Sequence, residues 1–180
     1  MRGTRDLGIK LQADADMLKA YVDASHAVHE NHRSHTGAVL TLGKGPIFVK
    51  SQKQRINSRS STESELIAVS DAITHVLWCR NWLVEQGYRE GPATVFQDNK
   101  STITLLESGA SNSQRTRHVS TKYFFAHDRI KSGEIKLEYK RTEDMIADIL
   151  TKPLQGSLFR RLRDLLLNWK GPRIEEDQDL

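Results

Sequence analysis

Residues 18–24 of the chain read LKAYVDA. Apolar side chains dominate this stretch, as is typical of a buried strand, yet it carries Asp23 close to its end. A carboxylate is costly to bury unless it is paired or bound to a metal ion. The stretch therefore predicts a strand that delivers an acidic side chain to a functional site.

Two further strands follow along the chain. The segments GAVLTL (37–42) and PIFVK (46–50) flank Gly43-Lys44-Gly45, a glycine-bearing turn that favours a hairpin. Together with residues 18–24 they predict three antiparallel strands. The intervening segment, His26 to His35, carries histidines at every third position, but no cysteine assists them, so we interpret it as a solvated loop rather than a metal site.

The strongest helical pattern runs from Ser61 to Gln86. Apolar residues recur there at the spacing of one buried helix face, and Gly87 follows as a stop signal. Ser61 or Thr62 is the expected cap. Trp78 and Trp82 could stack on nucleic-acid bases, but their place in this apolar helix favours packing in the core.

The rest of the chain alternates strands with helices. The patterns predict strands at 93–97 and 135–139, helices at 100–106, 119–130 and 158–169, a short helical turn at 144–151, a polar loop at 108–117 and an acidic tail from 175. Strand–helix–strand crossovers place the last two strands parallel to the first. The order predicts an α/β fold with one mixed sheet.

Four acidic residues stand out in this arrangement: Asp23, Glu65, Asp98 and Asp148. Asp23 and Asp98 both lie at carboxyl ends of predicted parallel strands, which meet at one edge of a sheet. Carboxylates gathered there would repel each other unless divalent cations held them. This composition suits a two-metal site for phosphoryl transfer, and therefore an enzyme that cuts nucleic acid.

Bulk composition sets the outer limits. The chain has 180 residues, 37% hydrophobic and 28% charged, which suits one folded domain and excludes a disordered chain. A net charge of +4 and a pI near 9.2 lean towards a polyanionic partner, although charge alone fits other basic proteins equally well. The single cysteine, Cys79, excludes an intrachain disulfide and indicates a reduced, intracellular setting. No apolar run is long enough to cross a membrane, and no membrane partner is expected.

Taken together, these motifs resemble the ribonuclease H domain of copia-type LTR-retrotransposon Pol polyproteins. The resemblance is carried by RGTRDLG (2–8), YVDA (21–24), KQ (53–54), SSTESEL (60–66), QDNKS (97–101), RH (117–118) and ADILTKPL (147–154). It implies a ribonuclease H-like fold whose mixed five-stranded sheet has three antiparallel strands, then two parallel ones, flanked by helices. It also implies that 1–17 end the reverse transcriptase connection segment, 18–154 form the ribonuclease H domain, and 155–180 form a C-terminal amphipathic helix and tail.

The resemblance implies an endoribonuclease that cleaves the RNA strand of RNA–DNA hybrids during retrotransposon reverse transcription, leaving 5′-phosphomonoesters. The implied catalytic and metal-binding residues are Asp23, Glu65, Asp98 and Asp148, with two Mg²⁺ as cofactors and Mn²⁺ as a substitute. Glu63 competes with Glu65, but the family places its acid before a leucine and a nearby alanine, as Glu65 stands here. Glu63 is then expected to support the helix start. Physical argument alone supports Asp148 least.

Selection of a hybrid requires contacts to RNA 2′-hydroxyls in the shallow minor groove. The candidate substrate-binding residues are Ser25, Ser61, Thr62, Asn99, Lys100, Arg117 and His118. Partners implied by the resemblance are the hybrid and the reverse transcriptase domain of the same polyprotein, in a cytoplasmic virus-like particle and the nucleus.

One feature departs from cellular and retroviral ribonucleases H. They often carry a histidine in the loop after the last strand, but Tyr139–Asp144 has none, which leaves open the group that moves the proton on the leaving side. The alternative function is a catalytically silent, transposon-derived module that only binds nucleic acid or has a structural role. A DNA-acting integrase or resolvase of the same superfamily fits less well, because such enzymes use three acids at different spacing.

Overall fold

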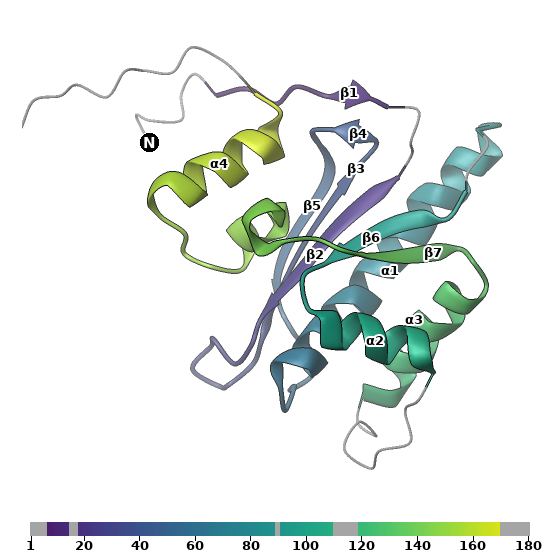
Figure 1. Ribbon diagram of the computed structural model, residues 1–180, viewed down its shortest axis with the longest axis vertical. Coiled ribbons are helices and arrows are strands. Elements are labelled where there is room, and N and C mark those ends of the chain that lie inside the picture. Colours follow the sequence, from purple (N-terminus) through teal and green to yellow (C-terminus); the bar gives the residue numbers. More distant parts are fainter. Residues whose placement is uncertain (1–6, 15–17, 89–90, 110–118, 170–180) are drawn as a thin grey trace, which may run out of the picture.

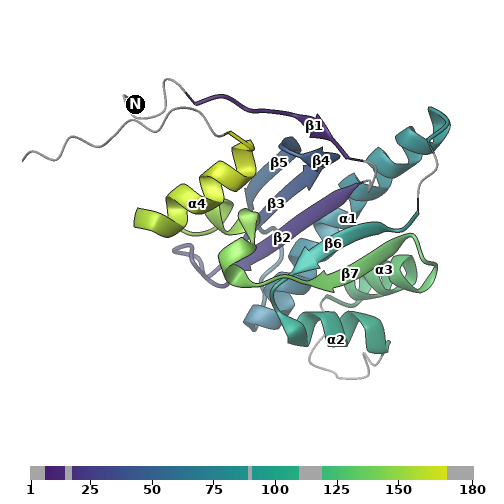
Figure 2. The ribbon, with the colours of Figure 1, turned by 45° about the horizontal axis from the view of Figure 1, so that its top comes forward.

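The computed structural model describes residues 7–14, 18–88, 91–109 and 119–169. At its centre is a five-stranded sheet in the order β5-β3-β2-β6-β7 (Figure 1). Its strands are β2 (Lys19–Ser25), β3 (His35–Thr41), β5 (Pro46–Lys53), β6 (Ala93–Gln97) and β7 (Ile135–Tyr139). β3 pairs antiparallel with both β2 and β5, whereas β6 pairs parallel with β2 and β7 (Figure 2). The predicted mixed sheet is confirmed.

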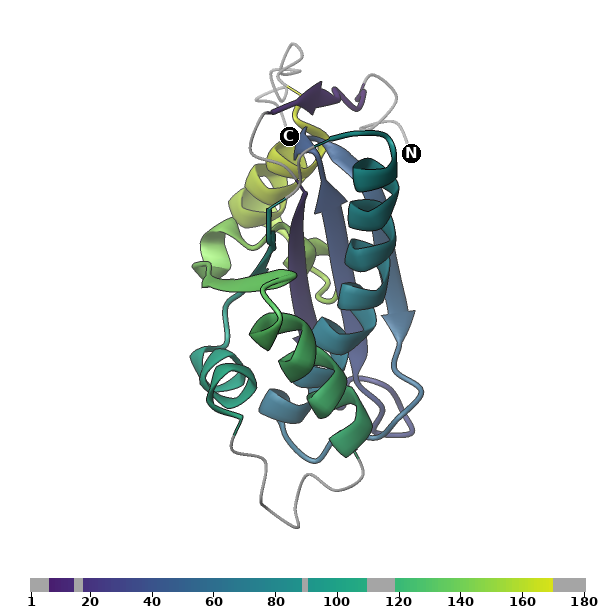
Figure 3. The ribbon, with the colours of Figure 1, turned by 90° about the vertical axis from the view of Figure 1, so that its right-hand side faces the viewer.

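Helices cover both faces of this sheet. On one face lie α1 (Ser61–Glu85), α2 (Lys100–Ser108) and α3 (Ser120–Lys131), and on the other lies α4 (Gly156–Leu167) (Figure 3). The larger core fills the space between the sheet and α1, with residues such as Val22, Ile67 and Tyr123. A smaller core joins Val39, Ile146 and Leu162, so α4 packs on the sheet domain itself.

A small ribbon that the sequence did not predict ties down the first described residues. β1 (Gln12–Ala13) pairs antiparallel with β4 (Gly43–Lys44). Gly43 has a φ of 115°, and a Cβ there would lie 2.5 Å from the carbonyl oxygen of Gln12, so only glycine fits. Strands of two residues carry no readable alternation, which is why this ribbon escaped prediction.

Two local expectations were wrong in detail. The N-cap of α1 is Ser60, not Ser61 or Thr62, because the Ser60 hydroxyl accepts a hydrogen bond from the Glu63 amide. Glu63 in turn accepts from the Arg59 amide, so its carboxylate stabilises the helix start, as predicted. The expected helical turn at 144–151 consists of two 3₁₀ turns, η3 (Thr142–Asp144) and η4 (Ile146–Leu150).

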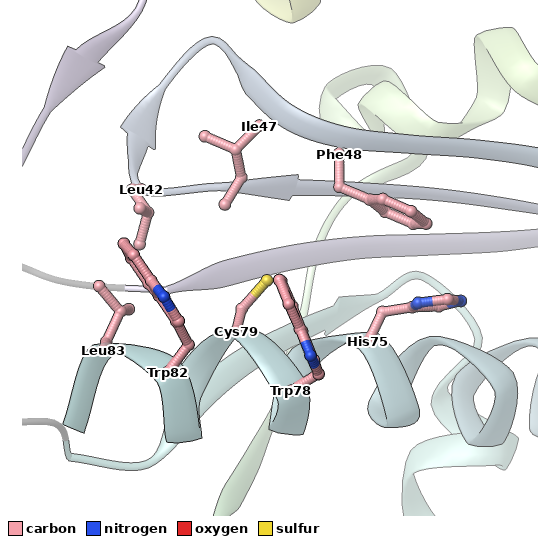
Figure 4. A pocket seen from close by; sticks show the side chains of 8 residues that line it. All are labelled: Leu42, Ile47, Phe48, His75, Trp78, Cys79, Trp82 and Leu83. Carbon is pink, nitrogen blue, oxygen red and sulfur yellow. The ribbon is translucent and has the colours of Figure 1, made fainter. Parts of the chain in front are cut away.

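The two α1 tryptophans are not in the core. Trp78 is 70% exposed and Trp82 is 52% exposed, and with Leu42, Ile47 and other residues they line an apolar groove of about 440 Å³ (Figure 4). The apolar pattern of the helix misled the prediction because Val76 and Leu83 of the same turns face the core, whereas Trp78 and Trp82 lie on the flank of α1 beside Ile47 and Phe48 of β5. Among the described residues, no helix is long and apolar enough to cross a membrane.

Candidate metal centre

The parallel pairing of β2 and β6 positions the first two acids. Asp23 lies near the end of β2 and Asp98 directly follows β6, and the register pairs Tyr21 with Phe96, so each acid stands two residues beyond a paired position. Asp148 reaches the same place from η4. Carboxylate oxygens of Asp23, Asp98 and Asp148 all lie within 4.8 Å of one another. The structure thus gathers three of the four predicted acids in one cluster.

Glu65 completes the acidic group from the side of α1. It is 5% exposed, and its carboxylate accepts a hydrogen bond from Gln97 at 3.0 Å. Burial raises its pKa well above the usual range, and the nearby charges of Asp23 and Asp98 raise it further. Glu65 therefore faces the cluster, while Glu63 is engaged at the helix start. The catalytic role of the four acids stays a prediction.

The approach of η4 to the sheet depends on a glycine opposite Asp23. Gly37 pairs with Asp23 across β2 and β3. A Cβ on Gly37 would lie 2.7 Å from the Thr151 methyl group and 2.8 Å from the Ala147 carbonyl oxygen. The Ser25 hydroxyl also donates to the Thr151 carbonyl oxygen at 2.9 Å. These contacts hold the segment that carries Asp148 flat against β3.

The acids share a buried, strongly anionic environment. Asp23 and Asp148 are each 1% exposed. Burial raises the pKa of Asp148 to about 6, with the charge of Asp23 adding to the rise and Lys152 opposing it. Burial also raises the pKa of Asp98, although a hydrogen bond from Thr142 at 2.9 Å opposes this. The cluster is therefore short of positive charge.

The residues of the cluster fit divalent cations. The ligand oxygens of Asp23, Asp98 and Asp148 all come from carboxylates. Carboxylates are hard ligands, which Mg²⁺ and Mn²⁺ prefer to soft ligands such as thiolates. Burial, together with the charge of Asp23, raises the pKa of Asp148, and a bound cation would oppose both effects. Asp23, Glu65, Asp98 and Asp148 are the residues that would hold such ions.

The raised pKa of Asp148 predicts a pH dependence of stability without metal. Because its folded pKa of about 6 exceeds the usual 3.8, the folded state holds the proton more tightly, and this contribution to stability is lost as the pH rises through 6. Asp148→Asn removes the titrating group. In EDTA, we expect the free energy of unfolding of this variant, relative to that of the wild type, to be about 1–2 kcal/mol higher at about pH 7.5 than at about pH 4.5. Chemical denaturation at both pH values measures it, and a stability difference that does not change with pH would contradict it.

A fully buried glutamine fixes the geometry between α1 and β6. The Gln97 side chain donates to Glu65 at 3.0 Å and accepts from the amides of Asp98 and Asn99 at 2.8 and 3.0 Å. Its amide orientation follows from these partners, since its oxygen faces two N–H groups. Gln97 thus ties two of the acids together. A buried amide at the end of an apolar strand was the available signal, and the sequence interpretation did not use it.

Gln97→Leu keeps the volume of this side chain but removes the tie. Glu65 would lose a donor and two backbone amides an acceptor, which costs about 1–2 kcal/mol of stability. We also expect Mn²⁺ affinity to fall several-fold, because Glu65 is no longer held towards Asp98. Thermal unfolding and titration calorimetry measure the two effects. The control is Gln52→Leu, at an exposed position on β5, and an equal effect in both variants would overturn the assignment.

The structure places the predicted substrate-binding residues unevenly. Ser25 is buried and its hydroxyl is bonded to the Thr151 carbonyl, so its side chain is engaged within the fold. Asn99 caps α2 by accepting from the Thr102 amide. Ser61 and Thr62 lie in the first turn of α1, and Lys100 is exposed beside the Tyr139 ring. Arg117 and His118 lie outside the described residues.

Three residues beside the acids were not singled out from the sequence. Thr142 donates to Asp98, Thr151 donates to Asp23, and Lys152 pairs with both Asp23 and Asp148. Thr151 and Lys152 belong to the ADILTKPL stretch, of which only Asp148 was predicted as a site residue. Their polar side chains, three and four residues after the candidate ligand Asp148, were the signal.

Comparison with known proteins finds similarity to retrotransposon polyproteins. The chain is 32% identical over 163 residues to the retrovirus-related Pol polyprotein from transposon RE1 of Arabidopsis thaliana, covering 89% of this chain and 11% of the relative. The corresponding polyprotein of transposon TNT 1-94 from Nicotiana tabacum is 28% identical over 167 residues, covering 92% and 12%. The chain thus spans about a tenth of the length of these relatives. No family model matches it.

Solved structures agree on the fold. LC11-RNase H1, isolated from compost, superposes with a TM-score of 0.56 at 16% identity, covering 75% of this chain and 92% of that one. The same protein in complex with an RNA/DNA hybrid gives a TM-score of 0.51 at 16% identity, covering 74% and 92%. The ribonuclease H-like fold is confirmed, as is the resemblance to copia-type Pol polyproteins.

Proposed function

We propose that this chain, whose fold is that of ribonuclease H and whose relatives are copia-type Pol polyproteins, cleaves the RNA strand of RNA–DNA hybrids during reverse transcription. The observation that carries the proposal is the convergence of Asp23, Asp98 and Asp148 within 4.8 Å, with Glu65 beside them. The fold neighbour crystallised with an RNA/DNA hybrid supports the choice of substrate.

In this proposal Asp23, Glu65, Asp98 and Asp148 would hold two Mg²⁺ ions, with Asp23 shared between a site that Glu65 and Asp98 would complete and a site that Asp148 would complete. When bound, such ions activate a water nucleophile and neutralise the charge that develops on the phosphate and the leaving oxygen. The products are RNA ends with a 3′-hydroxyl and a 5′-phosphate. Mn²⁺, with the same preference for oxygen ligands, substitutes for Mg²⁺.

The protein contributes by holding these carboxylates in place before any metal ion binds. Gln97 positions Glu65, Thr142 positions Asp98, and Thr151 positions Asp23, each by a hydrogen bond to a carboxylate oxygen. Such bonds limit the rotation of side chains that would otherwise turn away from one another. Preorganisation of this kind lowers the barrier because the acids need not move when substrate arrives.

Recognition of RNA is proposed to involve the start of α1 and the start of α2. The first of these, α1, begins with Ser61 and Thr62 and also carries Glu65. The second, α2, begins after Asp98 with Asn99 as its N-cap and Lys100 as its first residue. Hydroxyl and amide groups there suit 2′-hydroxyls, and Lys100 suits a phosphate. The reverse transcriptase region of the same polyprotein is the proposed partner, within a virus-like particle.

An end-labelled RNA–DNA hybrid in low salt with Mg²⁺ tests the proposal. Single-stranded RNA, double-stranded RNA and double-stranded DNA of the same sequence are run beside it. We expect cutting of the hybrid only, in its RNA strand, with 5′-phosphate products. If the folded protein binds the hybrid but cuts nothing with either Mg²⁺ or Mn²⁺, the alternative of a silent binding module replaces this function.

A further inference from the structure

A lysine lies among the acids proposed to bind metal. The Lys152 ammonium is 2.8 Å from Asp148 Oδ1 and 3.5 Å from Asp23 Oδ1. Both carboxylates are almost completely buried, whereas the Lys152 side chain is 37% exposed. The lysine thus reaches inward from the surface and places its positive charge between two carboxylates that a divalent ion would also need.

The backbone makes this reach a built feature. Lys152 follows Asp148 by four residues, and its amide donates to the Asp148 carbonyl oxygen at 3.0 Å, which turns both side chains to the same side. The preceding Thr151 donates to Asp23 Oδ2. Adjacent residues therefore engage both oxygens of Asp23, and Gly37 leaves them the space to do so.

Glu65 and Asp98 are held by a different set of groups. Gln97 donates to Glu65, and Thr142 donates to Asp98. Both donors are neutral. Of the acids proposed for this side, Lys152 contacts only Asp23, at 3.5 Å, so a cation here would displace the longer of its two contacts and leave the 2.8 Å contact with Asp148 in place. The two sides of the cluster therefore differ: one is held by neutral donors and the other by an ammonium.

We propose that Lys152 is a built-in counter-ion that competes with the divalent cation proposed for the Asp23–Asp148 side, so that the two ions bind sequentially. This inference rests on the proposed function, because it assumes that the cluster binds divalent cations. The side formed with Glu65 and Asp98 fills first. The Asp23–Asp148 side fills only when the ammonium turns outward, which its partly exposed, flexible stem permits.

Two consequences follow from such competition. Without metal, Lys152 stabilises the fold, because it offsets repulsion between buried carboxylates. With metal, it weakens the second binding step, because the ion must displace a charge-assisted hydrogen bond. A neutral side chain of similar length should therefore have opposite effects on the two quantities.

The test is Lys152→Met, studied by thermal unfolding in EDTA and by calorimetric titration with Mn²⁺ and Mg²⁺. We expect a lower melting temperature in EDTA and about tenfold tighter binding of the second ion. Lys152→Arg keeps the charge and should keep the weak second step. Lys136→Met removes one positive charge from an exposed position on β7 and controls for net charge.

Each outcome has a distinct meaning. If Lys152→Met binds the second ion no more tightly than Lys136→Met, the counter-ion role is wrong while the metal centre stands. Adding Asp148→Asn to Lys152→Met should abolish the gain, and a gain that survives would place the competition elsewhere. If neither the wild type nor Lys152→Met binds divalent ions, even with hybrid present, the proposed function itself fails.

Discussion

Asp23→Asn is expected to reduce cleavage of an RNA–DNA hybrid by about a thousandfold while leaving the protein folded. Asp23 is 1% exposed, and its carboxylate belongs to the cluster that also includes Asp98 and Asp148. The amide has the same shape, so packing in β2 is retained, but it removes the charge on which both proposed ions depend. Single-turnover cleavage and hybrid-binding assays measure the effect.

A matched pair of glutamates on α1 serves as the control for this prediction. Glu65→Gln should impair cleavage strongly, whereas Glu63→Gln should retain it, because Glu63 accepts from the Arg59 amide at the helix start. Both residues are almost fully buried on the same helix, and both changes remove one charge. Full activity in Asp23→Asn, or equal losses in the two glutamate variants, would contradict the assignment.

Gly37→Ala is expected to cause the largest structural effect. The new Cβ would meet the Thr151 methyl group at 2.7 Å, the Ala147 carbonyl oxygen at 2.8 Å and the Leu150 Cβ at 3.0 Å. Two neighbouring elements must separate to relieve these contacts, which costs about 1–3 kcal/mol, or about 3–10 °C in Tm for a chain of this size. Because η4 carries Asp148, Mn²⁺ affinity should fall with stability.

Gly91→Ala provides the comparison for this clash. A Cβ on Gly91 meets nothing within 4 Å, so the same substitution there adds a methyl group without a contact. Because Gly91 is exposed, we expect the Tm of Gly91→Ala to stay within about 2 °C of the wild-type value. Thermal unfolding and Mn²⁺ titration of both variants check this. Indistinguishable behaviour of Gly37→Ala and the wild type would show that β3 and η4 are not as close as described.

The sheet could be predicted because its strands carry strong local patterns and its connections follow general rules. Residues 93–97 and 135–139 match β6 and β7. Because strand–helix–strand crossovers join parallel strands, the carboxyl ends of β2 and β6 were expected at one edge, so the proximity of Asp23 and Asp98 followed from topology. Asp148 could not be reached in this way, because it lies in η4, a 3₁₀ helix of five residues that is too short to show a helical period.

What escaped prediction depends on distances that sequence spacing does not encode. The pairing of Lys152 with Asp148 follows local spacing, but its contact with Asp23 joins residues far apart in the chain. Gln97 resembled any polar residue at a strand end until its three partners were known. The prediction for Trp78 and Trp82 was wrong because an apolar helix pattern does not say which apolar side chains face the core and which lie on the flank of the helix.

Paramagnetic broadening by Mn²⁺ shows directly whether the acidic cluster binds divalent cations. Small amounts of Mn²⁺ added to ¹⁵N-labelled protein should first broaden the amide signals of Ala24, Asp98 and Asp148 and spare that of Trp82. Asp23→Asn should abolish this selective broadening. Broadening that is unchanged in Asp23→Asn, or that centres instead on the histidines of residues 26–35, would contradict the account.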